Sequence, residues 1–222
     1  MKLKEIFNQL TFGEFSQLNL GGAASGGITE ENYAAVVAHI NMGVTALHTR
    51  FLLREGAADL SLVSGQVDYL LPEDCLKLLE VVAPSGIPLP LNNRGAVLSC
   101  MTPSASLLRV PAAVVEKLDS LPDYFKTDIL QLRYQQAPLP LAVDDFGIDP
   151  ETVDVELPYT HLQALLMFIA ARLYSLGEIS GQPLAYNAYY ARYEAECAQL
   201  IQAGMSVSQQ AQFNRLRACG WV

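Results

Sequence analysis

The chain has 222 residues, of which 51% are hydrophobic, and its 23 acidic and 14 basic side chains leave a net charge of −9. This composition excludes a disordered protein and suits one domain, or a main body with lobes, that buries roughly 70% of the surface exposed by the unfolded chain. The acidic balance excludes the broad attraction to phosphates on which non-specific DNA binding depends. It fits either ordinary solubility or a channel wall along which DNA slides without sticking.

The four cysteines are scattered along the chain, and none forms a C-x-x-C pair. We therefore expect free thiols in a reducing compartment, without a disulfide framework or a zinc site. The basic amino terminus is not followed by the apolar stretch of a signal peptide. The most apolar run, residues 162–174, is shorter than the ~20 residues needed to cross a bilayer. These features predict a soluble protein, made in the cytoplasm, with no membrane partner.

Residues 1–28 form an N-terminal segment with a short predicted helix at 4–10 and a flexible glycine-rich link at 21–27. No lysine follows the glycines, so they do not indicate a phosphate loop. A long helix is predicted for residues 29–55, with Thr29 as its N-cap and Gly56 as its C-terminal cap. Its apolar residues recur with the 3.6-residue period of a helix, at Tyr33, Val36, Val37, Ile40, Val44, Leu47 and Phe51.

The hydrophobic period then changes to two, which predicts a β-rich lobe over residues 57–157. Within it, residues 60–71 predict a β-hairpin that turns at Ser64-Gly65. The prolines in this region lack a backbone donor, which assigns their stretches to sheet edges or extended arms. The other predicted strands are residues 76–82, 107–110, 129–135 and 153–157, and the prolines are Pro88, Pro90, Pro138 and Pro140.

Two helices are predicted after the lobe. Residues 159–176 are apolar around almost the whole circumference of a helix, which indicates burial on more than one side. The next helix begins near Pro183 and stops at Gly204. Residues 29–56 and 158–204 therefore predict a bundle of three main helices. The expected fold class is α+β: a helical bundle with an inserted antiparallel β-rich lobe and an extended C-terminal tail.

The C-terminal tail, residues 205–222, has no acidic side chain. Tryptophan and arginine dominate binding hot spots, where truncation of one side chain often costs roughly 2 kcal/mol or more. We therefore predict a docking arm whose partner contacts are Phe213, Arg215, Arg217 and Trp221. The alternative is a frayed terminus with Trp221 packed against its own chain.

No set of residues predicts catalysis or metal binding. His39 and His48 are nine residues apart, which places them on opposite sides of one helix, about 180° out of phase. His161 opens a buried helix and is expected to make a local hydrogen bond. A carboxylate cluster lacks the spacing of a calcium loop and is expected to be a solvated acidic turn; it consists of Asp144, Asp145 and Asp149. We expect no enzyme, no cofactor and no metal site.

Four stretches of the chain resemble the head-to-tail adaptor (connector) proteins of short-tailed and related bacteriophages. They are Gly13–Leu18, Gly43–Phe51, Glu156–Leu165 and Arg217–Val222, in the family's order of helix, hairpin, β lobe, two helices and short basic tail. The resemblance implies a structural virion protein at the head–tail junction, with no catalytic residues. It implies a dodecameric ring between the portal protein and the tail tube or nozzle protein, assembled in the host cytoplasm. DNA would pass through the lumen without sequence-specific binding.

Such a ring requires two complementary side patches on each subunit. The helix at 159–176 and a tyrosine-rich face on the next helix are the expected sources, because tyrosine is favoured at interfaces. The interface tyrosines would be Tyr186, Tyr189, Tyr190 and Tyr193. The alternative is that these surfaces pack within the chain.

Two other functions fit the same sequence. The first is another ring-shaped virion part, such as a tail-completion or tube-terminating protein. The second is a small metal-dependent hydrolase built on Asp144, Asp145 and His161, which the scarcity of histidine opposes.

Overall fold

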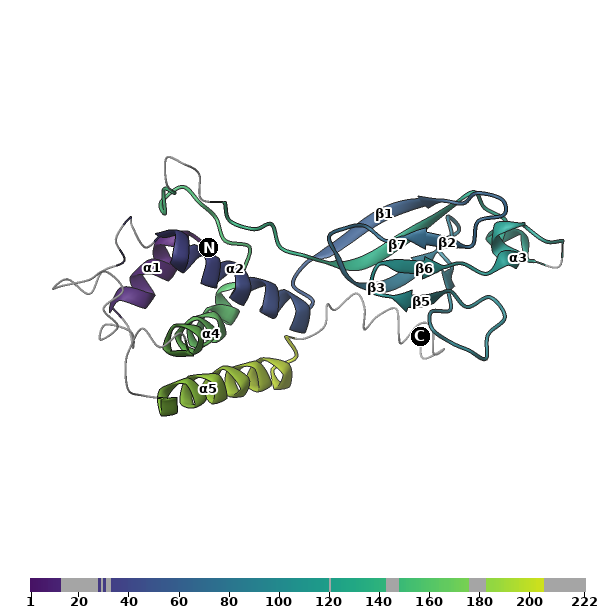
Figure 1. Cartoon of the computed structure of the whole chain (residues 1–222). Coiled ribbons are helices and arrows are strands. Elements are labelled where there is room, and N and C mark those ends of the chain that lie inside the picture. Colours follow the sequence, from purple (N-terminus) through teal and green to yellow (C-terminus); the bar gives the residue numbers. More distant parts are fainter. Residues whose placement is uncertain are drawn as a thin grey trace. The chain divides into compact units, whose positions relative to one another are not determined.

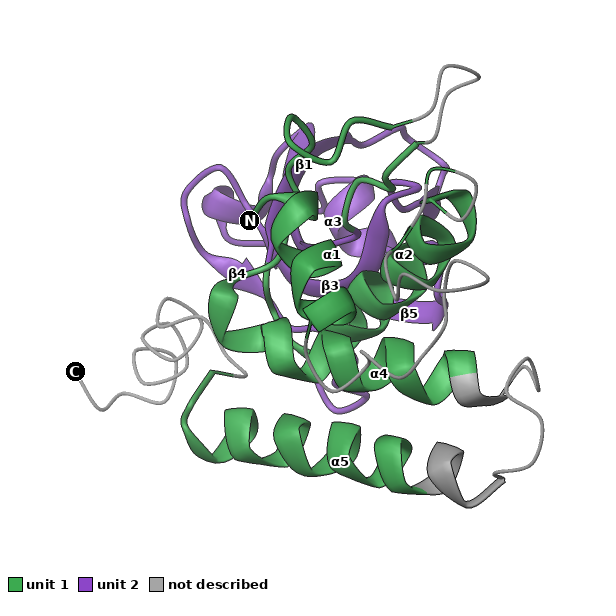
Figure 2. Cartoon of the chain, turned by 90° about the vertical axis from the view of Figure 1, so that its left-hand side faces the viewer, with its two compact units in different colours: residues 1–53, 138–222 green, residues 54–137 purple. Residues whose placement is uncertain are grey.

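The computed structural model describes residues 1–12, 28, 30, 33–119, 121–142, 148–175 and 183–205, and for residues 174, 175 and 183–187 it describes the backbone alone. The chain forms two compact units, of which the helical unit is Met1–Leu53 with Pro138–Val222 and the β unit is Arg54–Ala137 (Figure 2). The β unit is inserted between two parts of the helical unit. The predicted α+β class is confirmed.

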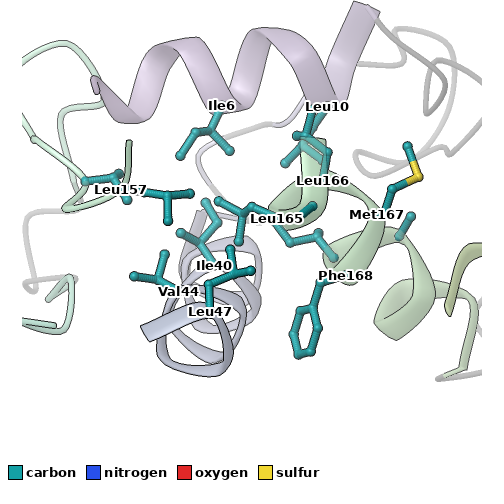
Figure 3. Packing of buried hydrophobic residues seen from close by; sticks show 14 of the residues in the cluster. Ile6, Leu10, Ile40, Val44, Leu47, Leu157, Leu165, Leu166, Met167 and Phe168 are labelled. Carbon is teal, nitrogen blue, oxygen red and sulfur yellow. The ribbon is translucent and has the colours of Figure 1, made fainter. Parts of the chain in front are cut away.

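The helical unit is organised around one apolar helix. Helix α4 (Leu162–Ser175) packs against α1 (Leu3–Phe12), α2 (Tyr33–Arg50) and α5 (Pro183–Gln202), and a 3-10 turn at Tyr159–His161 precedes it. Figure 3 shows α1 side chains pointing towards those of α2 and α4. Every residue from Ala164 to Ala171 is buried, so the predicted burial of this helix on more than one side is confirmed. In the described part of the chain, no helix has the length and apolar character needed to cross a membrane.

The first residues of the chain belong to this core rather than to a separate segment. Leu3, Ile6 and Leu10 of α1 are fully buried in the same cluster as α2 and α4. The Met1 backbone exchanges hydrogen bonds with Val155, at 3.1 Å from the terminal amine and 2.8 Å to the Met1 carbonyl oxygen. The strand predicted at 153–157 is therefore wrong: the segment makes a single bridge, between Asp154 and Lys2.

The segment after the β unit also differs from the prediction. Residues 138–157 were expected in the β-rich lobe, but they lie in the helical unit. One reason is a pair of reciprocal hydrogen bonds, since Asn41 of α2 donates to the Leu141 carbonyl and accepts from the Leu141 amide, both at 2.9 Å. A second reason is hydrophobic, because Val155 and Leu157 are buried in the helical core. The hydrogen bonds of Leu141 and the burial of Val155 and Leu157 therefore place this segment in the helical unit, although its period-two pattern predicts strand.

Two predicted helix ends have different outcomes. Helix α2 ends at Arg50, so the predicted cap at Gly56 is wrong. Gly56 instead lies in a strand, where an added Cβ would come within 2.7 Å of the Tyr134 ring. Gly204 does stop α5 as predicted: it follows the helix with a φ of 77°, a left-handed conformation that glycine adopts without strain. The predicted caps Thr29 and Gly177 lie outside the described residues.

The β unit contains two antiparallel sheets (Figure 1). One has the order β1-β7-β3-β4, and the other has the order β2-β6-β5. Both contribute to one buried cluster, which also includes side chains of the short helix α3 (Ala112–Val115) and the 3-10 turn Asp123–Phe125. The strands are β1 (Glu55–Ser61), β2 (Asp68–Leu70), β3 (Cys75–Val82), β4 (Pro88–Leu89), β5 (Met101–Ser104), β6 (Leu107–Arg109) and β7 (Ile129–Gln136).

The predicted hairpin at 60–71 is wrong, although both of its arms contain strand. β1 pairs with β7 and β2 pairs with β6, so the two arms enter different sheets. The turn between them is bonded to the segment after α3, since the Glu116 carboxylate accepts hydrogen bonds from the Ser64 hydroxyl (3.0 Å) and the Gly65 amide (2.7 Å). The strands predicted at 76–82, 107–110 and 129–135 are confirmed within one or two residues.

A substitution at Gly43 would test how closely α2 and α4 approach each other. A Cβ at this position would meet Leu165 Cδ1 at 2.5 Å and Phe168 Cδ1 at 3.0 Å. Gly43→Val should therefore lower the free energy of unfolding by about 1–3 kcal/mol through overpacking, measured by urea denaturation followed by circular dichroism. Thr45→Val, on the exposed side of the same helix, is the control and should change it little. Equal stability of the two variants would contradict this packing.

Candidate interaction surfaces

Apart from Met205, the predicted docking arm lies outside the described residues. This holds for all four of its expected contact residues, Phe213, Arg215, Arg217 and Trp221, and also for Asp144 and Asp145 of the acidic loop. Asp149 is described, and its carboxylate accepts a hydrogen bond from the Glu151 amide at 3.0 Å, within a turn whose Pro150 carbonyl accepts from the Lys4 amide of α1. That arrangement fits the predicted acidic turn.

The tyrosines of α5 do not form one outward-facing surface. Tyr193 is 5% exposed and packs edge-to-face against Phe168 of α4, with ring centroids 5.4 Å apart. Tyr189 is half-buried against the helical core, whereas Tyr190 is 44% exposed. Tyr186 lies in α5, but its side chain is outside the described set. Tyr193 therefore faces the helical core, whereas Tyr190 faces solvent.

Tyr193 joins three helices of the unit. The Arg50 guanidinium at the end of α2 lies 6.0 Å from the Tyr193 ring centroid and donates a 2.8 Å hydrogen bond to the Glu194 carboxylate. Burial raises the pKa of the Tyr193 hydroxyl to about 12, so this side chain stays neutral at physiological pH. The sequence contains no local signal for the Arg50–Glu194 pair, because the two residues are far apart in the chain. These contacts place Tyr193 in the packing of its own chain.

The outer face of α5 carries the exposed apolar groups. Tyr190 is followed along the helix by Ile201, 44% exposed, and by Met205 just beyond the helix end, 45% exposed. Four small side chains, Ala188, Ala191, Ala195 and Ala198, are also exposed. At 100° per residue they lie further round the solvent side of the helix, where they would let another helix approach closely. This face, defined by Tyr190, Ile201, Met205 and the four alanines, is called the α5 face below.

Two histidines are buried together in the helical unit, a pairing that the sequence analysis did not find. His48 Nε2 donates to the Glu156 carbonyl at 2.9 Å. His161 is 2% exposed, with Nδ1 3.0 Å from the Thr160 hydroxyl and its ring 4.8 Å from that of Phe51. The predicted local hydrogen bond of His161 is confirmed. Burial, and secondarily the neighbouring His48, lowers the pKa of His161, so it packs as a neutral ring.

The described part of the chain brings together no group of three or more histidine, cysteine or acidic side chains that could hold a metal ion. Cys75, Cys100 and Cys197 are free thiols, and Cys219 lies outside the described residues. Burial raises the pKa of the Cys100 thiol to about 12, so this cysteine is not a reactive thiolate at neutral pH.

Replacing the two tyrosines should separate their roles. Tyr193→Ala should lower the free energy of unfolding by about 3–5 kcal/mol, because it removes a buried ring between helices. Tyr190→Ala should lower it by less than about 1 kcal/mol, because its ring is largely exposed. Urea denaturation of both variants measures the difference. A larger loss for Tyr190→Ala would show that the outward tyrosine belongs to the core.

His161 predicts a loss of stability in mild acid. Its pKa is lower in the folded chain than the unfolded value of about 6.5, so the unfolded chain binds the proton more readily. Stability is therefore complete above about pH 6.5 and falls at lower pH, by at most about 1.4 kcal/mol per pH unit for one proton. His161→Phe keeps an aromatic ring and should flatten the decline between pH 7 and 5 in urea denaturation. An unchanged slope would exclude His161 as its source.

A chain in a solved assembly, described as the virion of a native gene transfer agent particle, is similar to this one. The two chains are 17% identical over 87% of this chain and 88% of the other, with a TM-score of 0.27. That value is too low to support an argument about fold or function. No curated protein matches the chain.

A sequence model of a protein family also matches most of the chain. The family is described as SU10 adaptor protein, and its model matches residues 17–217. The matched range includes the α2 end and the start of α4, two of the four stretches on which the resemblance was based. It spans helices and strands of both units. The chain therefore belongs to the SU10 adaptor protein family of phage head-to-tail adaptors, which gives it a structural role in the virion.

Proposed function

We propose that the chain forms a ring between the portal protein and the tail tube or nozzle protein, and that DNA passes through this ring without sequence-specific binding. The family match over residues 17–217 is the observation that carries the proposal. The net charge of −9 is consistent with it, because a lumen lined by carboxylates repels the phosphates of DNA. In this proposal the ring is dodecameric and assembles in the host cytoplasm.

The α5 face is the proposed contact with a neighbouring subunit. A closed ring needs a heterologous interface, in which one surface of each subunit meets a different surface of the next. Tyr190 supplies a large aromatic group with a polar tip, and the four alanines allow close helix packing. Tyr193 is excluded from this contact because its ring is already buried within its own chain.

The tail is the proposed contact with the portal or with an adjacent subunit. Residues 205–222 contain no acidic side chain, while Arg215, Arg217, Phe213 and Trp221 supply the groups that dominate hot spots. In this proposal the tail orders as it binds, so its contacts stabilise the assembly.

Deletion of residues 208–222 tests the role of the tail. The shortened chain should unfold at the same urea concentration as the full chain, but its affinity for purified portal rings should fall at least about 30-fold, which corresponds to the loss of roughly 2 kcal/mol. Binding is measured by co-sedimentation, and the copy number by native mass measurement. Tyr190→Ala is the parallel variant for the α5 face and should reduce the number of copies per portal.

Two results would contradict the proposed function. One is that the full chain does not bind portal rings. The other is that it binds the end of a tail tube equally well without a portal, which would favour a tube-terminating protein. An image of the virion neck that traces side chains would locate the chain directly.

A further inference from the structure

The four sheet edges of the β unit differ in their ability to accept another strand. β4 begins with Pro88 and is followed by Pro90, while β5 contains Pro103 and a register shift against β6. β2 has only three residues. These are the devices by which proteins block exposed edges. β1 has seven residues, no proline and an unbroken register with β7. Among the described strands, it is the edge open to pairing.

The backbone groups of β1 alternate in direction. The Gln136 amide donates to the Arg54 carbonyl at 3.0 Å, and the Leu62 amide donates to the Asp128 carbonyl at 2.8 Å, on either side of the paired region. Hydrogen-bonded pairs alternate along an antiparallel ladder, so the even-numbered residues of β1 bond to β7. The amides and carbonyls of residues 55, 57, 59 and 61 consequently point away from β7, towards the open edge.

The side chains of β1 alternate in the same way. Residues 55, 57, 59 and 61 are exposed, and residues 56, 58 and 60 are partly buried. Two of the exposed residues, Glu55 and Asp59, are acidic. Arg133 lies opposite Ala57 on β7, but it forms an ion pair with Glu80 at 3.6 Å. The open edge therefore has a negative outer face and a small, apolar inner face.

This pattern selects against some partners. Pairing of two copies of β1 is disfavoured, because it would bring their carboxylates close together and like charges on paired strands destabilise the pairing. A basic strand would pair without that repulsion. The basic strand would also need small or apolar residues in alternation with its charges, so that these residues lie beside Gly56, Ala58 and Leu60 on the inner face.

The chain itself contains a segment with this pattern. In Arg215-Leu216-Arg217-Ala218 the basic residues alternate with apolar ones. We propose that residues 213–219 of a neighbouring copy add to the open edge of β1 as an extra antiparallel strand, with Cys219 opposite Ala57, Arg217 opposite Asp59 and Arg215 diagonally across from Asp59. This inference rests on the proposed ring, and it names the adjacent subunit, rather than the portal, as the binding site of the tail.

A natural cysteine allows the contact to be trapped. Cys219 has the same parity as Arg215 and Arg217, so in the added strand it lies on the outer face, and the proposed register places it directly opposite Ala57. Paired strands bring Cα atoms within the roughly 4.4–6.8 Å that a disulfide requires. The full-length Ala57→Cys chain, bound to portal rings and mildly oxidised, should therefore give a ladder of covalent dimers and higher oligomers on a non-reducing gel.

Ala58→Cys is the matched control. Its side chain lies on the opposite face of β1, so its ladder should be at least tenfold weaker, and adding Cys219→Ser to Ala57→Cys should abolish the ladder. Asp59→Lys should reduce trapping of Ala57→Cys at least tenfold. Adding Arg217→Glu should restore it, which a merely structural effect of the lysine would not allow.

Each outcome decides the question. Portal-bound adaptor without a ladder would overturn the inference while the proposed function stands. An intrachain disulfide in a monomer would overturn the neighbouring copy as the source of the strand. A chain that does not bind portal rings would contradict the proposed function, and the inference would fall with it.

Discussion

Burial of helix α4 is the constraint on which the helical unit depends. The helix has apolar residues around most of its circumference, so a single neighbour cannot cover it, and α1, α2 and α5 each take one side. Gly43 allows α2 to lie directly against Leu165 and Phe168. The same requirement recruits the chain segment near Val155, which fastens α1 to the unit by backbone hydrogen bonds. Most of the apolar surface of α4 is therefore buried within the subunit and is not available to a neighbouring subunit.

The sequence predicts elements better than partners. The 3.6-residue period locates α2, α4 and α5, and the apolar runs locate β3 and β7, because both patterns are local. β1 begins earlier than predicted because Gly56, Ala57 and Ala58 are too small to show a period of two. The false hairpin at 60–71 has another cause: pairing of β1 with β7 joins residues that lie far apart in the chain, and no local pattern encodes that choice.

The candidate surfaces show the same division. Tyrosines at 186, 189, 190 and 193 are spaced so that several faces of one helix receive them, and spacing alone does not say which face meets the core. The structure resolves this for two of them: Tyr193 contacts Phe168, and Tyr190 faces outward. The Arg50 contact with Glu194 depends on how the end of α2 meets α5, which follows from tertiary packing. The tail could be assessed from composition alone.

The two ends of the β unit lie side by side, because the Gln136 amide donates a hydrogen bond to the Arg54 carbonyl. Residues 53 and 138 of the helical unit are therefore attached to neighbouring chain ends, as at the base of a stem. Insertions with closely spaced ends can be exchanged, shortened or enlarged without altering the host domain, provided that the junction is kept. Closely spaced ends thus allow a different β unit to be joined to the same helical unit, and allow this one to be replaced by a short linker.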